Sequence, residues 1–392
     1  MLKSTHKTNK SHKKIYLDYA SSVFPNPSSI HALGVEAQKE LQNARKKVAQ
    51  NLSARPSEII FTSGGTESNN LALAGVVWDF FENKKNIVPH IVTTNIEHPS
   101  VLLTCEMLKK RKLVEVSIMP VESSGIVDVK KIKKAIKKNT VLVSVMYANN
   151  EIGTIQPIRE IAKEIRHYRK TKSTIFPLFH SDAVQAVNYL DLNVERLGVD
   201  LLSISGSKIE GAGRVGVLYK RTSTPLMNIM GGGQQEGGLR PGTENLSEII
   251  KFSDALQLAE VMKAKEVARL NKIQNHFLNK IQHSDILKNF GILINGSLEN
   301  RLPNNINLTI PKIPSDLLVI ELSAKNIMVS SKSACESGDG KSSYVIKAIN
   351  KESRDTDGSL RFSFGRDTSK EDINYTVKAL EQILTKLKKW YS

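Results

Sequence analysis

The sequence predicts an α/β protein, with a large domain built on a mainly parallel sheet flanked by helices and a smaller α+β C-terminal domain. Two observations support this prediction. Up to about residue 245, short apolar segments of strand length alternate with stretches of helical spacing, which is typical of a parallel sheet covered by helices on both faces. Beyond that point one long helical stretch interrupts the alternation, which indicates a second unit.

Seven apolar segments of the first unit are predicted to be buried strands. They are Glu58–Thr62, Ile91–Thr94, Val114–Met119, Val141–Met146, Ile175–Phe179, Leu201–Ser205 and Val215–Tyr219. Helices are predicted between several of them, the first because its apolar residues recur with the spacing of one helical face. The predicted helices are Leu33–Val48, Glu67–Phe81, His98–Arg111, Ile158–Arg169 and one that carries six lysines between Lys130 and Lys138.

The second unit is predicted to mix helices and strands. Its elements are a helix from Glu244 to about Gln282, a strand near Asn305–Ile310, a helix near Ser315–Ala324, a strand near Leu360–Ser363 and a final helix from Ser369. We therefore expect a basic tail over residues 1–14, a large domain over 15–250 and a small C-terminal domain over 251–392 that carries Cys335.

The composition is that of an ordinary soluble protein, with 40% hydrophobic and 24% charged residues. No apolar run approaches the roughly 18 residues of a membrane span, and the N-terminus lacks the apolar core of a secretory signal. The only cysteines are Cys105 and Cys335, far apart in the chain. We therefore expect neither a disulfide framework nor a metal site, and we expect a reducing, cytoplasmic location.

The formal net charge of +17 has two explanations. It indicates either a polyanionic partner such as RNA or helix faces that carry solvated lysines. Because no aromatic residues interleave with the lysines to stack on bases, we favour the second and expect no direct nucleic-acid binding. The first 14 residues hold five lysines and no acid, which predicts a disordered basic arm. An organellar transit peptide is a less favoured alternative, because arginine and an apolar face are missing.

One candidate phosphate site follows the first predicted strand. The segment Thr62-Ser63-Gly64-Gly65-Thr66-Glu67-Ser68 turns on its glycines into a helix, and a helix N-terminus attracts an anion. Gly65 and Thr66 would supply the donors. The alternative is an ordinary helix cap, with Thr66 or Ser63 satisfying the helix amides.

Two more candidates lie beyond later strands. Asp182 and Gln185 follow Ile175–Phe179, where a carboxylate could pair with a protonated ring nitrogen or merely cap a turn. Lys208, in Ser205-Gly206-Ser207-Lys208, follows Leu201–Ser205, where burying a lysine is costly unless it is paired or covalently used. With 56 basic residues, chance placement of Lys208 is the alternative.

The fourth candidate is Cys335, in a small, polar, glycine-containing segment over residues 330–340. This composition predicts an exposed mobile loop. An exposed thiol near basic groups is a candidate nucleophile, although an incidental surface cysteine is the alternative. Cys105 lies within the predicted helix His98–Arg111, so we expect it to be packed.

Together these features predict a site for pyridoxal phosphate (PLP). The cofactor needs a lysine that binds it covalently, an acid that faces its pyridine nitrogen and a cup for its phosphate. Lys208, Asp182 and the Gly65–Thr66 turn supply one each from the ends of predicted strands. The joint occurrence of all three is a stronger indication than any one of them.

The chain resembles the NifS/IscS-type cysteine desulfurases of the class V aminotransferase group, which adopt PLP fold type I. The resemblance covers nearly everything after residue 15. Matching segments are residues 17–20, 26–31, 62–69, 97–98, 149–153, 182–185, 205–208, 240–243, 333–335 and 361–363.

The resemblance implies a role for each matching residue. For the cofactor, Lys208 would be its covalent anchor, Asp182 would face the pyridine nitrogen, and His98 would stack on the ring as a further catalytic residue. Gln185 and Asn150 would lie near the ring hydroxyl. The phosphate would be bound by Gly65, Thr66, Ser205, Ser207 and the partner subunit's Thr243. Arg361 and Asn150 would hold the substrate, and Cys335 would accept its sulfur as a persulfide. The implied reaction converts L-cysteine to L-alanine within a homodimer, and it supplies sulfur to an iron–sulfur scaffold or a tRNA-thiolating enzyme.

Three departures from the family pattern bear on these expectations. The segment between Ala20 and Asn26 is short, which affects the expected dimer contact and the cleft rim. Ser207 stands where a histidine commonly precedes the lysine. Lys332 and Glu336 flank the cysteine where small residues are common. Two other classes stay open at this point: a class V aminotransferase or lyase in which Cys335 is incidental, and an RNA-associated or scaffold protein that uses the fold without catalysis.

Overall fold

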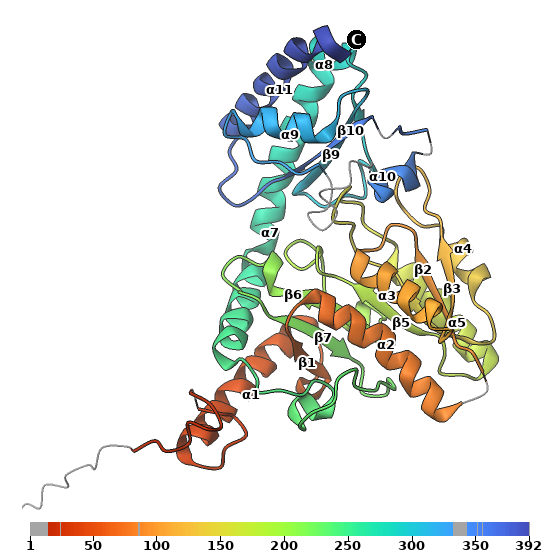
Figure 1. The fold of residues 1–392 in the computed structure, drawn as a ribbon, viewed down its shortest axis with the longest axis vertical. Helices are drawn as coiled ribbons and strands as arrows, with labels where there is room; N and C mark the ends of the chain where they lie inside the picture. The colour runs from red at the N-terminus through yellow and green to blue at the C-terminus, as the bar shows by residue number, and fades with distance from the viewer. Residues whose placement is uncertain are drawn as a thin grey trace, which may run out of the picture.

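The computed structural model describes residues 15–23, 25–84, 87–331, 343–350, 352–354 and 356–391, and Figure 1 shows how their helices and strands are arranged. The basic tail and the segment that carries Cys335 lie outside the described residues. Predictions about the structure of these two segments therefore stay predictions.

A seven-stranded sheet forms the centre of the first unit. Its strands are β1 (Ile59–Thr62), β2 (His90–Thr94), β3 (Glu115–Met119), β4 (Thr140–Ser144), β5 (Leu178–Asp182), β6 (Leu201–Ser205) and β7 (Gly216–Lys220), in the order β1-β7-β6-β5-β4-β2-β3. Only β7 runs against its neighbours, β1 and β6, so the prediction of a mainly parallel sheet is confirmed. Since β1 and β6 are both antiparallel to β7, their C-terminal ends lie at the same edge as those of β2, β4 and β5.

Helices cover both faces of this sheet, as predicted. The elements around it are α1 (Ala32–Leu52), η1 (Pro56–Glu58), α2 (Gly65–Asn83), α3 (Pro99–Lys110), α4 (Val129–Ala135), α5 (Ile158–Lys172), α6 (Val194–Leu197), η2 (Gly206–Lys208) and η3 (Gln235–Gly238). Successive strand residues alternate between the two faces: Ile60 packs in the cluster of α2 and α3, whereas Ile59 and Phe61 pack with α1 and α5. This alternation is the two-residue period of a strand.

The second unit has a small antiparallel sheet of its own. Its elements are α8 (Asp285–Asn289), β8 (Leu293–Ile294), β9 (Asn305–Ile310), α9 (Ser315–Ser323), α10 (Tyr344–Ile349), β10 (Gly358–Ser363) and α11 (Lys370–Tyr391), with strand order β10-β9-β8. The long helix α7 (Leu246–His283) runs between the two units (Figure 1). Its first half contributes Phe252 to the core of the large sheet and its second half contributes Phe277 to the core of the small one. A domain boundary at residue 250 stays a prediction, since one helix serves both cores.

Three sequence predictions were wrong in detail. The strand predicted at Ile175–Phe179 begins at Leu178 and includes Asp182, because Ile175 is exposed while the polar residues His180 and Ser181 are buried. Strand β3 is an edge strand that pairs only with β2 among the described strands, and it is not fully buried. Helix α4 ends at Ala135, so Lys137 and Lys138 do not share it.

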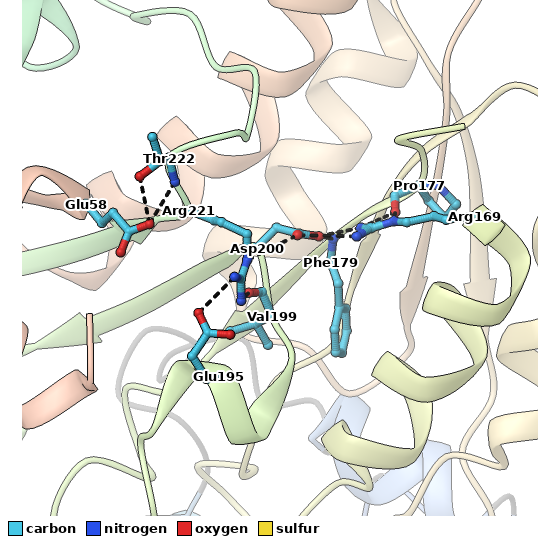
Figure 2. A network of polar contacts seen from close by, with 9 residues as sticks. All are labelled: Glu58, Arg169, Pro177, Phe179, Glu195, Val199, Asp200, Arg221 and Thr222. Carbon is cyan, nitrogen blue, oxygen red and sulfur yellow. Dashed lines mark hydrogen bonds and ion pairs between the residues drawn. The ribbon is translucent and has the colours of Figure 1, made fainter. Parts of the chain in front are cut away.

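A polar network around the buried carboxylate of Asp200 holds the opposite edge of the sheet, at the N-terminal ends of β5 and β6 (Figure 2). The carboxylate of Asp200, just before β6, binds the guanidinium of Arg169 on α5 and accepts from the backbone N of Phe179 at 2.7 Å. The backbone N of Arg221, which follows β7, donates to the backbone O of Asp200 at 2.9 Å, and its Nη1 donates to Glu195 at 2.8 Å. The network therefore ties α5, β5, β6 and β7 together at one end of the sheet.

No helix among the described residues has the length and apolarity that crossing a membrane requires.

Candidate active site

Ten of the twelve residues predicted for the site line one cavity of about 270 Å³. They are Gly65, Thr66, His98, Asn150, Asp182, Gln185, Ser205, Ser207, Lys208 and Arg361, joined by Asn69, Ser100, Met146 and Val184. Most of them follow the C-terminal ends of β1, β2, β4, β5 and β6, where open α/β sheets bind their ligands. Arg361 comes instead from β10 of the second unit.

An anion cup forms where β1 passes into α2. The helix begins at Gly65, and its N-cap residue Gly64 has no side chain that could cap the first amides. Gly65 and Thr66 line the cavity, so these backbone donors are available to an anion there. A Cβ atom at Gly65 would lie 2.7 Å from Cγ2 of Val184, so only glycine fits this close approach. The hydroxyls of Ser205 and Ser207 lie 3.0 Å apart on the same cavity.

The carboxylate of Glu67 holds this turn in place through two hydrogen bonds. Its carboxylate accepts from the backbone N of Ser63 at 2.7 Å and from Nε of Arg240 at 2.9 Å. Burial opposes the charged form, but the hydrogen bonds from Arg240 and Ser63 outweigh it and lower the pKa of Glu67. The turn is thereby linked to the segment that leads to Thr243.

Asp182 is the last residue of β5 and is buried. Its Oδ2 accepts from Nδ2 of Asn69 at 2.7 Å and its Oδ1 from the backbone N of Val184 at 3.0 Å. Asn69 is itself buried on α2, one turn after Thr66. These donors fix the carboxylate at the wall of the cavity.

His98 is the N-cap residue of α3, at the end of the loop that follows β2. Its Nδ1 lies 2.8 Å from Oγ of Ser100 and accepts from the backbone N of Ser100 at 3.1 Å. Burial lowers the pKa of His98 below its usual value; the carboxylate of Asp182 opposes this shift and Lys208 adds to it. The ring is therefore favoured in its neutral form.

Lys208 ends the short helix η2 directly after β6, as predicted. Its side chain is exposed, so the argument that burial makes a lysine costly here was wrong. The backbone O of Lys208 accepts from Asn188 at 2.5 Å. The side chain also lines a second, smaller cavity of about 170 Å³ with Glu210 and Arg366.

Arg361 brings a positive charge to the rim of the cavity from β10. Its Nη1 donates to the backbone O of Asn150 at 3.0 Å and its Nη2 to Oγ of Ser330 at 3.2 Å. Burial lowers the pKa of Arg361, and the carboxylate of Glu151 opposes the shift. Nε of Arg361 and Oδ1 of Asn150 are buried without a hydrogen-bond partner among the described residues, which marks them as polar groups available to a ligand.

Thr243 and Cys335 do not join this cavity within the described chain. Thr243 lines a different cavity of about 670 Å³, between α1 and the start of α7. Cys335 lies outside the described residues. The described residues on either side of its segment lie beside the site: Ser330 exchanges backbone hydrogen bonds with Arg361, and the hydroxyl of Ser343 donates to Glu151 at 2.5 Å.

Cys105 is buried in α3, so the prediction that it is packed is confirmed. Burial, with a further contribution from Glu97, raises the pKa of its thiol to about 12. A thiol with such a pKa stays protonated at neutral pH and is a poor nucleophile.

Asn69 and Ser100 also line the cavity, but no role was predicted for either residue. A signal for each was present. Asn69 follows Thr66 by three residues, so it lies on the same face of a helix, and Ser100 is two residues beyond His98, where a side chain can reach the cap.

The cavity fits PLP by the chemistry of its donors and by its unsatisfied atoms. The uncapped N-terminus of α2 with Ser205 and Ser207 suits a phosphate, and Asp182 suits a protonated ring nitrogen. Lys208 is an amine within the same cavity. The described residues hold no group of three His, Cys, Asp or Glu side chains that could bind a metal ion.

Residues 4–376 match the family Aminotransferase class-V, so the chain belongs to that family. It is 40% identical to the cysteine desulfurase IscS of Dictyoglomus turgidum over 96% of each chain. It is 38% identical to the cysteine desulfurase IscS of Methanosarcina thermophila, over 95% of this chain and 88% of that protein. The resemblance to NifS/IscS-type cysteine desulfurases is thereby confirmed.

Solved structures agree with this assignment. A NifS-like protein that is 34% identical superposes with a TM-score of 0.81 and covers 92% of each chain. The structure of SspA in complex with cysteine is 31% identical, with a TM-score of 0.70 over 88% of this chain and 92% of that one. These matches confirm the predicted fold class.

Proposed function

We propose that this chain is a PLP-dependent cysteine desulfurase, which converts L-cysteine to L-alanine and passes the sulfur to Cys335. The observation that carries the proposal is the single cavity that unites Lys208, Asp182, His98 and an uncapped helix N-terminus, with Arg361 at its rim. Two relatives are named cysteine desulfurases and the similar SspA structure is a complex with cysteine, which supports the choice of substrate.

Each part of the cavity would perform one task. The amides that begin at Gly65, with the hydroxyls of Ser205 and Ser207, would hold the phosphate, and Asp182 would bind the ring nitrogen in its protonated form. Bound PLP supplies an electron sink that stabilises a carbanion at the substrate Cα. Lys208 would hold the cofactor covalently and, once displaced by the substrate amine, would take the Cα proton.

Arg361 would bind the substrate carboxylate. Its Nε is buried without a partner among the described residues, and its two outer nitrogens are held by Asn150 and Ser330. Because these contacts fix the guanidinium, it would orient the substrate as well as attract it. The side chain of Asn150, whose Oδ1 also lacks a partner among the described residues, would complete the polar rim.

The sulfur transfer balances without an external oxidant. The thiolate of Cys335 attacks the substrate sulfur, an S–S bond forms and the C–S bond breaks. The electron pair of the broken bond goes to the carbon that becomes the alanine methyl group. The products are a persulfide on Cys335 and L-alanine, so the thiol and cysteine are consumed in equal amounts.

Assembly and location belong to the same proposal. We propose a homodimer in which Thr243 reaches the phosphate of the other subunit, because Thr243 lies outside the cavity of its own chain. An active monomer in sedimentation at assay concentration would contradict this. We also propose that the protein works in the cytoplasm, and that its sulfur goes to an iron–sulfur scaffold or a tRNA-thiolating enzyme.

One experiment tests the activity. The protein is incubated with PLP, L-cysteine and a reductant, and sulfide and alanine are measured together; we expect them in a one-to-one ratio. Borohydride should fix PLP on Lys208. An amino-group transfer without sulfide would favour a class V aminotransferase instead, and a protein that binds no PLP would favour the scaffold alternative.

A further inference from the structure

Four buried or half-buried side chains form a continuous chain of hydrogen bonds from Asp182 to His98. Nδ2 of Asn69 donates both to Oδ2 of Asp182, at 2.7 Å, and to Oγ of Ser100, at 2.8 Å. Oγ of Ser100 lies 2.8 Å from Nδ1 of His98. The chain joins β5, α2 and α3 across the floor of the cavity.

The direction of each bond follows from the chemistry of the groups. An ionised carboxylate can only accept, so the amide of Asn69 must turn its NH₂ group toward Asp182. The second hydrogen of that group then points at Oγ of Ser100, which accepts it. The hydroxyl hydrogen of Ser100 is left to donate to Nδ1 of His98, where the backbone N of Ser100 already donates at 3.1 Å.

We propose that Asp182, acting through Asn69 and Ser100, fixes His98 as the tautomer that carries its proton on Nε2. A neutral imidazole has one protonated nitrogen, and Nδ1 is committed as an acceptor. His98 therefore presents an N–H donor to the ligand and no lone pair. Asn69 and Ser100 are positioning residues.

The charged groups around His98 are consistent with a ring that stays neutral. Asp182 on β5 favours the protonated ring and Lys208 on η2 disfavours it, while burial disfavours it most. A second proton would have to enter at Nδ1, against the two donors of Ser100. For the reaction proposed above, on which this consequence rests, the Cα proton then goes to Lys208 and not to His98.

Nitrogen-15 NMR of the histidine-labelled holoenzyme tests the tautomer without measuring activity. Protonated and unprotonated ring nitrogens have different shifts, and the His98 signals are identified by their loss in His98→Gln. We expect a protonated Nε2 and an unprotonated Nδ1 near neutral pH. A protonated Nδ1 in the wild-type protein would overturn the proposal, whatever the desulfurase assay shows.

Two variants test the role of the chain. Ser100→Ala removes one donor to Nδ1, so the pKa of His98 should rise by roughly half to one pKa unit and the Nδ1-protonated form should become detectable. Asn69→Leu frees the Ser100 hydroxyl and should act in the same direction. An unchanged pKa and tautomer in both variants would show that the chain does not act on His98.

Ser144→Ala is the matched control. Its hydroxyl lies 2.8 Å from Nδ1 of His180, a buried histidine of β5 that is hydrogen-bonded through both ring nitrogens. This variant should alter the signals of His180 and leave those of His98 unchanged. In the Ser100 and Asn69 variants, unaltered His180 signals verify that the sheet is folded.

Discussion

At the scale of single residues, glycine is required at position 65 by the close approach of a neighbouring side chain and not by an unusual backbone conformation. Its position at the start of α2 brings the backbone close to Val184, which follows Asp182. The sequence predicted the phosphate cup from the glycine turn, but the contact with Val184 joins segments that are 119 positions apart and leaves no local signal.

The first prediction concerns this close approach. In Gly65→Ala the new Cβ atom would meet Cγ2 of Val184 at 2.7 Å, and overpacking of this kind typically costs about 1–3 kcal/mol. We expect PLP affinity, measured by titration of the apoprotein, to fall by about fivefold or more. Gly231→Ala is the control, since no atom of the described residues lies within 4 Å of a Cβ atom there; an equal loss in both variants would contradict the prediction.

Glu97 is a second residue whose state is set by its surroundings. It is fully buried next to His98, and its Oε1 accepts from the backbone N of Met146 and the hydroxyl of Thr94. Burial raises the pKa of Glu97 to about 8, and the charge of Asp182 adds to the shift while the two hydrogen bonds oppose it. The folded protein therefore keeps this proton at a pH at which the unfolded chain has released it.

The second prediction is the sign of the resulting pH dependence. Because the folded pKa lies above the unfolded one, the contribution of Glu97 to stability falls as pH rises from about 4.5 to about 8. Glu97→Gln has no proton to lose, so its stability relative to the wild type should increase over this range, by on the order of a few kcal/mol, and level off above it. Urea unfolding at pH 5, 6.5, 8 and 9 measures this; a difference that is constant with pH would refute it.

At the scale of elements, a pattern of apolar residues predicts the bounds of a strand well only where apolar side chains are buried along its whole length. Strands β6 and β9 have the predicted bounds because their apolar residues, Leu201, Leu202 and Ile204 in one and Ile306, Leu308 and Ile310 in the other, are all buried. Strand β5 was displaced because His180 is buried through hydrogen bonds to Ser144 and Ser203 on its neighbours, and not through apolar contact. A pattern of hydrophobicity cannot predict that a polar residue is buried when its hydrogen-bond partners lie on other strands.

The third prediction tests the polar network at the far edge of the sheet. Asp200→Asn would leave Arg169 without its buried charged partner, and breaking such a pair from one side costs about 3–5 kcal/mol. We expect a loss toward the lower end of this range, because Asn can still accept from Phe179. Asp191→Asn is the control: Asp191 pairs with Arg159 and Arg196 near the surface, where about 0–1 kcal/mol is expected.

Thermal unfolding of both variants at neutral pH measures the difference. Because neither Asp200 nor Arg169 lines the cavity, and Asp200 lies at the opposite end of β6 from Ser205, PLP binding at low temperature should be retained in both proteins. A loss of PLP binding in Asp200→Asn without a loss of stability would show that the network acts on the site instead.

At the scale of the whole molecule, the site is assembled from both units of the chain. Arg361 on β10 donates to Asn150 of the large unit, and Ser343 donates to Glu151 beside it. Two residues predicted for the site are not in the cavity: Thr243, for which we propose a role in a second subunit, and Cys335, which lies outside the described residues. The sequence pattern can predict which side chains belong to the site, but the tertiary packing of the two units decides which of them share one cavity.

The last prediction is that the two cysteines differ in their role in sulfur transfer, because they differ in where they lie in the molecule. The thiol of Cys105 is buried in α3, and its pKa of about 12 keeps it protonated, so Cys105→Ser should turn over L-cysteine at a nearly normal rate. Cys335 belongs to a segment whose described neighbours, Ser330 and Ser343, are held beside Arg361 and Glu151. Cys335→Ser should therefore bind PLP and L-cysteine but form no persulfide, because only a thiolate can take up the sulfur. Mass spectrometry after L-cysteine treatment should find one added sulfur on the peptide that contains Cys335; added sulfur on Cys105, or normal sulfide release by Cys335→Ser, would remove Cys335 from the reaction.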